Sequence, residues 1–465
     1  MAALSDQKIE IVRTLVQSAP DKIVGGLQRA LSESSGDTVL ASVRQLVEAE
    51  AKDRLLRNAI FQPVAPLFVG DGSDVQSLVF PARALAALWR ALKAAEPQVI
   101  SAAVSLVEAI AAAEASARRP PDPARAFDEI VAIAASALRT SDHRDFRMVM
   151  ETCERARPGG GAALTACLDI APVVRQTLPR LADWVTHQDD ETGAAARLAY
   201  KDAVAISEDA GPRFFEMLAG QLSPPWMVLR IISAIMDKPT ERYLADSELG
   251  GFPERVMAEI DSSLKMIGKL DLDAGPEAAR AAAKAISLVT QQTFELEVCI
   301  ELTRESGWGR RVVDQKKALA SLVEGRLRDS EKLIAAALPT HSSGFTRPRR
   351  TGPKLDALPD PKPVRRAMTL LTFAHEIRHS ANHGGFSAMH AKVMEKLWAA
   401  VEAYAEDVLG DLRNGDVDDL AIAHAYLRTV ADMAGLIHDE KAAEFMRRRA
   451  AAACLPAESG QTSDT

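Results

Sequence analysis

Apolar residues recur along most of the chain at intervals of three and four residues, which is the spacing of one face of an α-helix. One such face runs from Val393 through Leu397, Val401 and Tyr404 to Val408. The alternation of apolar and polar positions that marks a half-buried strand is nearly absent, and helix-favouring alanine, leucine, glutamate and arginine dominate. The pattern therefore predicts an all-α protein.

Prolines divide this pattern into segments of helical length. Such segments, each with a proline close to one end, cover 5–19, 38–61, 82–95, 98–118, 226–236 and 277–304. The stretch 62–80 is where a short strand or an ordered loop is expected. Because no repeat of fixed period is found, we expect irregular layers of helices rather than a regular solenoid.

The clearest break in the pattern lies at 339–363, which is rich in proline, glycine and serine. We interpret it as an interdomain linker between a helical region, 1–338, and a C-terminal helical bundle, 364–454. A further boundary is expected near 118–124, and 455–465 is expected to be a disordered tail. The prediction is an irregular multi-helix N-terminal region followed by a C-terminal helical bundle.

Composition places the chain among intracellular globular proteins. With 465 residues, 47% of them hydrophobic, it can form two or three domains that each bury a core. The four cysteines show no CxxC spacing, which indicates reduced thiols. Asp6, Lys8 and Glu10 interrupt the N-terminus where a signal peptide needs an apolar core, and the longest apolar stretches carry glutamates. We therefore expect a cytoplasmic protein without membrane insertion.

The net charge of −8 argues against a surface that binds nucleic acid generally. The predicted linker is an exception, because basic residues gather there and at the start of the next helix. They are Arg347, Arg349, Arg350, Lys354, Lys362, Arg365 and Arg366. This cluster could meet an acidic partner or a nucleic acid, although a solvated linker has the same composition.

The segment from His375 to His383 is where candidate chemistry gathers, since six of the nine histidines lie from His375 onward. The pattern predicts a helix that ends at a turn formed by Gly384 and Gly385. Its apolar stripe comprises Leu370, Ala374, Ile377 and Ala381. His375 and His379 are then expected to project from the opposite, polar face of this helix.

His375, Glu376 and His379 match the HExxH pattern and so resemble the zincin metallopeptidases. In that motif two imidazoles one helical turn apart bind zinc, and the carboxylate between them activates the metal-bound water. The resemblance implies a zinc-dependent hydrolase with His375 and His379 as zinc ligands and Glu376 as the catalytic carboxylate. His383, or a glutamate of the next helix such as Glu402, would complete the ligand set.

The same segment also resembles the phosphoacceptor helix of histidine phosphotransfer domains. There an exposed histidine is followed by an apolar residue two positions on, a basic residue three on and a glycine ten on, as His375 is by Ile377, Arg378 and Gly385. The resemblance implies His375 as the nucleophile and Arg378 as the cation that stabilises the phosphoryl group. Because no glycine-rich ATP-binding boxes follow, it implies a phosphorelay module rather than a kinase.

Both resemblances are short, and a polar helix face with hydrogen-bonded histidines has the same residues. Our interpretation is therefore an intracellular helical binding, scaffold or regulatory protein that offers helical grooves to a protein partner. Phosphotransfer and zinc-dependent hydrolysis are the alternatives. No bound cofactor is expected in the first case, and zinc is expected in the hydrolase case.

Overall fold

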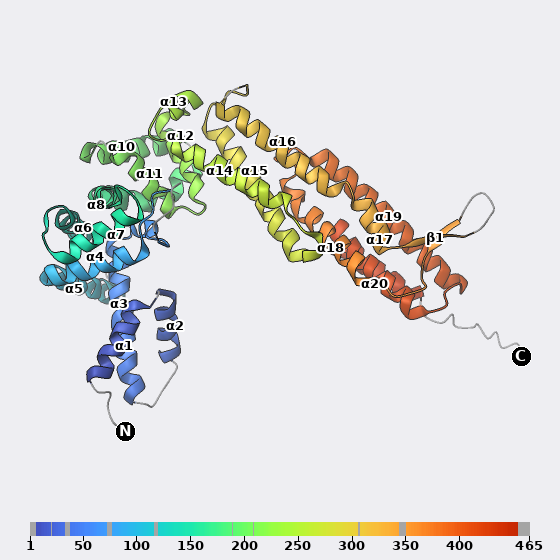
Figure 1. The fold of residues 1–465 in the computed structure, drawn as a ribbon, viewed down its shortest axis with the longest axis horizontal. Helices are drawn as coiled ribbons and strands as arrows, with labels where there is room; N and C mark the ends of the chain where they lie inside the picture. The colour runs from blue at the N-terminus through green and yellow to red at the C-terminus, as the bar shows by residue number, and fades with distance from the viewer. Residues whose placement is uncertain are drawn as a thin grey trace, which may run out of the picture. The chain divides into compact units, whose positions relative to one another are not determined.

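The computed structural model describes residues 6–19, 21–32, 38–71, 77–115, 120–187, 189–207, 209–305, 307–343 and 350–453. Helices make up nearly all of this part of the chain, and the fold is all-α as predicted (Figure 1). The chain divides into two compact units. Unit 1 comprises 1–238 and 247–249, and unit 2 comprises 239–246 and 250–465.

Unit 1 is built from twelve described helices and short 3₁₀ turns. The helices are α1 (Asp6–Ser18), α2 (Asp21–Ser32), α3 (Thr38–Ile60), α4 (Ala82–Ala95), α5 (Pro97–Ala115), α6 (Ala124–Thr140), α7 (Arg144–Ala156), α8 (Gly160–Thr177), α9 (Leu181–Thr186), α10 (Asp190–Ile206), α11 (Ala210–Gln221) and α12 (Val228–Met236). Helix α8 packs against α6, α7, α10 and α11. Its Leu164, Leu168, Ile170 and Val174 are buried, which fits a helix that is apolar nearly all round.

Helices α1 and α3 are joined by a buried arginine. Arg54 of α3 donates hydrogen bonds from Nη2 to the carbonyl oxygens of Val16 and Gln17 in the last turn of α1, at 2.9 and 3.1 Å. Its Nε donates to Glu50 at 2.7 Å. The guanidinium thus satisfies carbonyls that a helix C-terminus leaves without partners, and its charge is balanced by a carboxylate on its own helix.

Unit 2 begins with a short helix and ends with four longer ones. Its elements are α13 (Glu241–Ala245), α14 (Gly251–Gly268), α15 (Pro276–Cys299), α16 (Gly307–Leu327), α17 (Ser330–Ala337), β1 (Thr340–Ser343), β2 (Arg350–Pro353), α18 (Pro361–Glu376), α19 (Ser387–Asn414), α20 (Leu420–Ile437) and α21 (Glu440–Ala453). Within this unit α15 packs against α14 and α18, while α20 packs against α18, α19 and α21.

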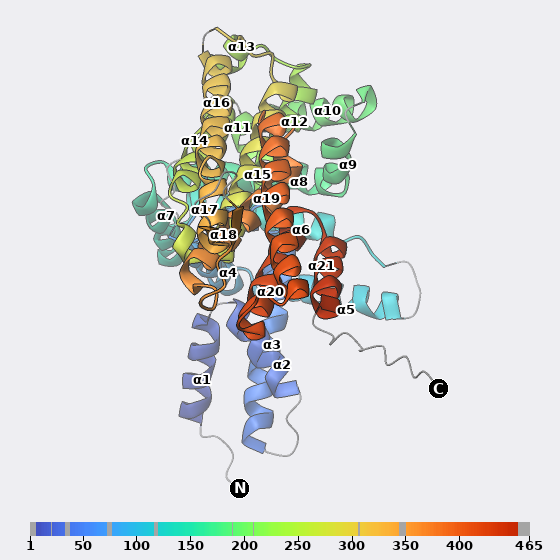
Figure 2. The same ribbon diagram turned by 90° about the vertical axis from the view of Figure 1, so that its right-hand side faces the viewer.

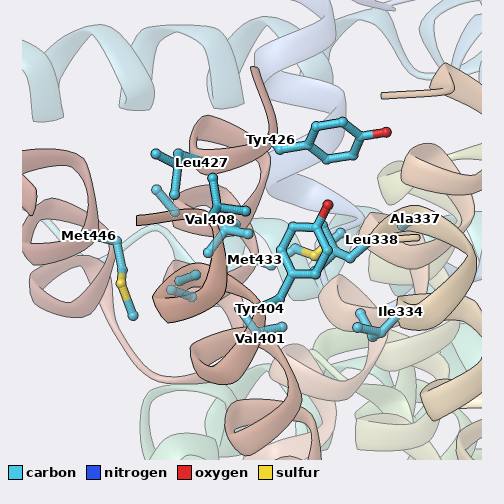
Figure 3. Close-up of a cluster of buried hydrophobic side chains, with 14 of the residues drawn as sticks. Ile334, Ala337, Leu338, Val401, Tyr404, Val408, Tyr426, Leu427, Met433 and Met446 are labelled. Atoms are coloured by element: carbon cyan, nitrogen blue, oxygen red, sulfur yellow. The ribbon is translucent and has the colours of Figure 1, made fainter. Parts of the chain in front are cut away.

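The core of unit 2 lies between α17, α18, α19, α20 and α21 (Figure 3). The predicted apolar face of α19 is confirmed, since Leu397, Val401, Tyr404 and Val408 are buried there. The rings of Tyr404 and Tyr426 lie 6.0 Å apart, centroid to centroid. Burial raises the pKa of the Tyr404 phenol above its ordinary value, so this ring stays neutral within the core.

The segment that the sequence marks as a linker, 339–363, lies inside unit 2. Strands β1 and β2 form an antiparallel hairpin in which Thr340 pairs with Pro353 and Ser343 with Arg350. Helix α18 then begins at Pro361, with the carboxylate of Asp360 accepting a hydrogen bond from the Lys362 N–H at 3.0 Å. The division between the units falls instead near 239–250, where no comparable run of proline and glycine drew attention.

Three smaller predictions concern the stretch 62–80, the boundary near 118–124 and the C-terminal tail. In 62–80, Phe68 and Phe80 form an isolated β-bridge after a 3₁₀ turn at Ala65–Leu67. Around the expected boundary at 118–124, α5 ends at Ala115 and α6 begins at Ala124. The predicted tail, 455–465, lies outside the described residues.

Helix α20 has the length and hydropathy of a membrane span, and so does the pair α4 and α5 if its 107° bend is allowed within one span. In unit 2, apolar side chains of α20 pack against the other helices of the same unit. Its residues buried in the unit 2 core include Ala423, Tyr426, Leu427, Val430, Met433 and Ile437. Core packing therefore accounts for much of the apolar character of α20.

Candidate functional site

The histidine-bearing segment connects α18 to α19. Helix α18 ends at Glu376, a 3₁₀ turn covers Ile377–Ser380, and α19 starts at Ser387. The sequence predicted one helix up to the glycine pair, and this is wrong by two turns of helix. The tighter turn keeps Ile377 and Ala381 buried, as predicted, while Gly385 takes a left-handed φ of 73° before the chain enters α19.

His375 is half-buried and bound to the end of another helix. Its Nδ1 lies 2.8 Å from the carbonyl oxygen of Leu436, in the last turn of α20. Since a carbonyl can only accept, Nδ1 carries the proton and donates it. Arg378 Nη1 lies 3.3 Å from the same nitrogen, but two donors cannot bond to each other. This tautomer leaves the lone pair of His375 on Nε2.

Arg378 and His379 are exposed and contact each other. Arg378 donates from Nε to Nε2 of His379 at 3.1 Å, so His379 accepts with the nitrogen that a zinc ligand of this motif would offer. An exposed contact between sequence neighbours contributes little to stability. The two imidazoles of the HExxH pattern therefore differ, because one is fixed by a helix end and the other by its neighbouring guanidinium.

His390 has a structural role that no local sequence pattern indicated. It lies in the first turn of α19, is 8% exposed, and its Nε2 donates to the carbonyl oxygen of Ala374 at 2.7 Å. Ala374 lies in the last turn of α18, so this imidazole satisfies a helix-terminal carbonyl just as His375 does for α20. The position of His390 in the sequence, shortly after the Gly384–Gly385 turn, could have indicated this contact, because a histidine placed there can reach the end of the preceding helix.

Two further contacts join the turn to α15. The ring of His383 lies edge-on to Phe294, with 5.4 Å between centroids. The carboxylate of Glu376 lies 3.9 Å from Nε of Arg280. Arg280 and Phe294 are on the same side of α15, so the exposed side of that helix runs alongside the turn from Glu376 to His383.

The predicted metal ligands do not converge. Glu402 lies fifteen residues into α19, roughly 22 Å of helix from its start, and its charge acts on Arg449 of α21. Throughout the described ranges, no group of three or more His, Cys, Asp or Glu side chains could hold a metal ion. Within the described residues, the HExxH pair of His375 and His379 therefore lacks the further ligands that a structural or catalytic zinc site needs.

The basic residues of 339–363 are dispersed where their side chains are described. Lys354 lies 3.8 Å from Asp356, and Arg366 lies 3.8 Å from Asp273. Arg347 and Arg349 lie outside the described residues. The expected contact of this cluster with nucleic acid or an acidic partner stays a prediction.

A cavity lies at the start of α16, next to α14. Its volume is about 450 Å³, and Asp261, Arg311 and Gln315 line it. Arg311 pairs with Asp261 at 2.7 Å and also with Glu254, so its charge is already matched. These partners raise the pKa of Arg311 against the opposing effect of burial.

The helix N-terminus beside this cavity is also occupied. Glu241 of α13 accepts hydrogen bonds from the backbone N–H groups of Thr303, Trp308 and Gly309, at 3.0, 3.2 and 3.0 Å. A carboxylate already sits where a helix dipole would attract an anion. The cavity therefore offers less for a ligand than the surface beside the histidine turn.

Comparison with known proteins does not add an assignment. No protein-family model matches the chain, and no curated protein and no solved structure is similar to it.

Proposed function

We propose that the chain is a non-catalytic helical binding protein whose partner docks beside the histidine-bearing turn. The docking site is the α15–turn surface, which comprises Lys284, Phe294 and Val298 of α15 and Arg378, His379 and His383 of the turn. The partner is a protein segment that combines acidic residues with an apolar anchor. The observation that carries the proposal is the exposed Phe294 ring packed edge-on against the exposed His383.

The apolar part of this surface is exposed although it lies on a well-packed helix. Phe294 is 42% exposed and Val298 is 36% exposed, one helical turn apart on the same side of α15. Solvent-facing aromatic residues held rigidly are the usual anchors of protein interfaces. The edge contact with His383 holds the Phe294 ring in place before a partner arrives.

The charge of this surface favours an acidic partner. Lys284 and Arg378 are exposed, and within the described part of the chain neither is paired with a carboxylate. In a chain whose net charge is −8, these two cations would speed the encounter with an acidic segment.

The bonding of the buried histidines supports a binding role over catalysis. His375 and His390 hold the ends of α20 and α18, and these contacts fix the turn that carries Arg378 and His383. A rigid base for exposed side chains is what a docking surface needs, because little entropy is then lost on binding.

Photocrosslinking followed by reconstitution tests the proposal. A benzophenone amino acid replaces Gln291, an exposed residue between Lys284 and Phe294, and in a control replaces Met266, which is 60% exposed on α14. We expect a protein crosslinked from position 291 and not from 266, through a segment rich in Asp and Glu. The purified partner segment should then bind Phe294→Ala about 30-fold more weakly, corresponding to about 2 kcal/mol for a central anchor.

Arg378→Glu should also weaken binding of this segment, because it reverses a charge at an exposed contact. The loss of affinity should be larger at low salt than at high salt, since salt screens exposed charges. A partner segment that is basic, or that binds wild type and both variants equally, would contradict the proposed site.

Phosphotransfer is a second candidate, favoured by the orientation of His375. Its Nδ1–H bond to Leu436 presents Nε2 as a nucleophile, with the Arg378 guanidinium close to the same ring. In such a reaction Nε2 forms a bond to the phosphorus of an aspartyl phosphate while the acyl phosphate P–O bond breaks and releases a carboxylate. Incubation with a phosphorylated receiver should then give acid-labile phosphate in wild type and in His383→Gln, but not in His375→Gln.

A further inference from the structure

The three helices at the start of unit 1 have a small shared core and several large apolar side chains in solvent. Both α1 and α2 pack against α3, around a core of Val16, Val24, Val47 and Ala51 (Figures 1 and 2). The exposed large apolar residues on these helices are Ile11, Leu15, Ile23, Leu27, Leu40 and Leu55. Among the described side chains of these helices, six large apolar ones are thus exposed, whereas the shared core buries three valines and one alanine.

On α1 the exposed pair lies beside the buried stripe. Ile11 precedes the half-buried Val12 by one residue, and Leu15 precedes the buried Val16 by one residue. One residue back along an α-helix is a rotation of about 100°. Ile11 and Leu15, one turn apart, therefore form a second apolar stripe next to the first.

On α2 the same offset recurs. Ile23 precedes the buried Val24 by one residue and Leu27 follows it by three, which places both about 60° to 100° to the same side of Val24. The two helices run in opposite directions along α3 (Figure 1). Helices α1 and α2 pack on α3, and each exposed stripe is rotated in the same sense from the buried stripe of its own helix. Because the two helices run in opposite directions, both exposed stripes lie on the same face of the three-helix group.

We infer that this face, formed by Ile11, Leu15, Ile23 and Leu27 and called here the N-terminal face, is where two copies of the chain associate. The size of the face fits a second copy. Helices α1 and α2 each span about 20 Å, and together with α3 between them they are about 30 Å wide, so a second copy that covered all three would bury about 600 Å² per copy. This is at the lower end of the area that a stable pair buries on each partner.

The charge balance of the segment that carries the N-terminal face also favours a second copy. Residues 1–60 contain eight acidic and eight basic residues, so the region has no excess charge to attract an oppositely charged partner. Helices that lie on membranes usually carry a strongly basic polar face. An apolar and electrically balanced face is complementary to itself, which is what a twofold pair requires.

Sedimentation velocity of the full chain tests this inference. We expect the wild type to pass from monomer to dimer between about 1 and about 100 μM. Leu15→Glu combined with Leu27→Glu should weaken dimerisation by about 100-fold or more, since each pairing would bury unpaired carboxylates. Both side chains are exposed in the monomer, so circular dichroism should show unchanged helix content.

A matched control and a milder variant separate this outcome from a general effect. Leu198→Glu combined with Ile206→Glu changes two exposed residues of α10 and should leave dimerisation unchanged. Leu15→Ala combined with Leu27→Ala should weaken dimerisation by about 10-fold, because it removes apolar area without adding charge. The milder pair therefore tests the face even if the glutamates disturb folding.

Three results would overturn the inference. A wild type that stays monomeric throughout the concentration series would do so, and so would a dimer that the N-terminal variants leave intact. Binding of a monomeric wild type to phosphatidylglycerol vesicles, lost in the Leu15 and Leu27 variants, would assign the N-terminal face to a lipid surface instead.

Discussion

Replacing His390 by alanine tests the most specific structural statement about the histidine-bearing segment. The imidazole is buried, and its Nε2–H group bonds to the Ala374 carbonyl across the junction of α18 and α19. Truncation removes that bond and leaves a helix-terminal carbonyl without its donor. It also leaves a cavity the size of the ring.

The magnitude follows from these losses. The net hydrogen bond is worth about 1 kcal/mol, and a buried carbonyl left unpaired costs about 1 to 3 kcal/mol. Partial collapse of the cavity keeps the packing loss at the lower end of its range. We therefore expect the opening free energy of unit 2 to fall by about 2 to 4 kcal/mol, which raises the opening equilibrium constant by about 30- to 900-fold.

Hydrogen–deuterium exchange read by mass spectrometry measures this loss, because it reports on α18 and α19 without requiring the whole chain to unfold in one step. Peptides from 361–376 and 387–414 should exchange faster in His390→Ala by that factor. His379→Ala is the matched control, since its described contact is the exposed one with Arg378, and its effect should stay within about 0.5 kcal/mol. Equal effects of the two substitutions, or unchanged exchange in His390→Ala, would refute the reasoning.

Three further predictions concern other parts of the molecule. Burial raises the pKa of the Cys167 thiol to about 12, so iodoacetamide at pH 8 should leave Cys167 unmodified in the folded protein and modify it in urea, and rapid native labelling would contradict this burial. The hydrogen bond from Arg449 lowers the pKa of Glu406 below its ordinary 4.5, so this pair stabilises the fold above that pH and its contribution is lost as the pH falls through the lowered value. Denaturation of Arg449→Met and wild type should therefore differ by about 0.2 to 1 kcal/mol at pH 7 and converge in acid, whereas a difference that grows in acid would reverse the assigned sign. Gly26→Ala should slow hydrogen exchange in α2 by stabilising it by about 0.5 to 1 kcal/mol, because no atom lies within 4 Å of the added methyl group, and faster exchange would show a hidden contact.

The helices could be predicted because their signals are local. The segment 82–95 is a helix with those bounds, and 38–61 matches α3 to within one residue. Proline next to a helix end and apolar residues at helical spacing depend only on neighbours in sequence. The same signals explain why Ile377 and Ala381 were correctly placed in the core.

The site could not be predicted in full because its determinants are far apart in sequence. His375 bonds to a carbonyl sixty-one residues away, and His383 packs on a ring from α15. No periodicity within the segment encodes those partners. The end of α18 at Glu376 was missed for the same reason, since tertiary contacts favour a 3₁₀ turn where local propensity continues the helix.

The tautomers of the histidine rings test the central claim most directly, namely that imidazoles of this segment hold helix ends and leave the turn for docking. Long-range ¹H–¹⁵N spectra of the histidine-labelled full chain report which ring nitrogen carries the proton. We expect His390 protonated at Nε2 and His375 at Nδ1, with neither ring shifting when zinc is added. The opposite tautomer at His390, or zinc-induced shifts at both His375 and His379, would contradict the account.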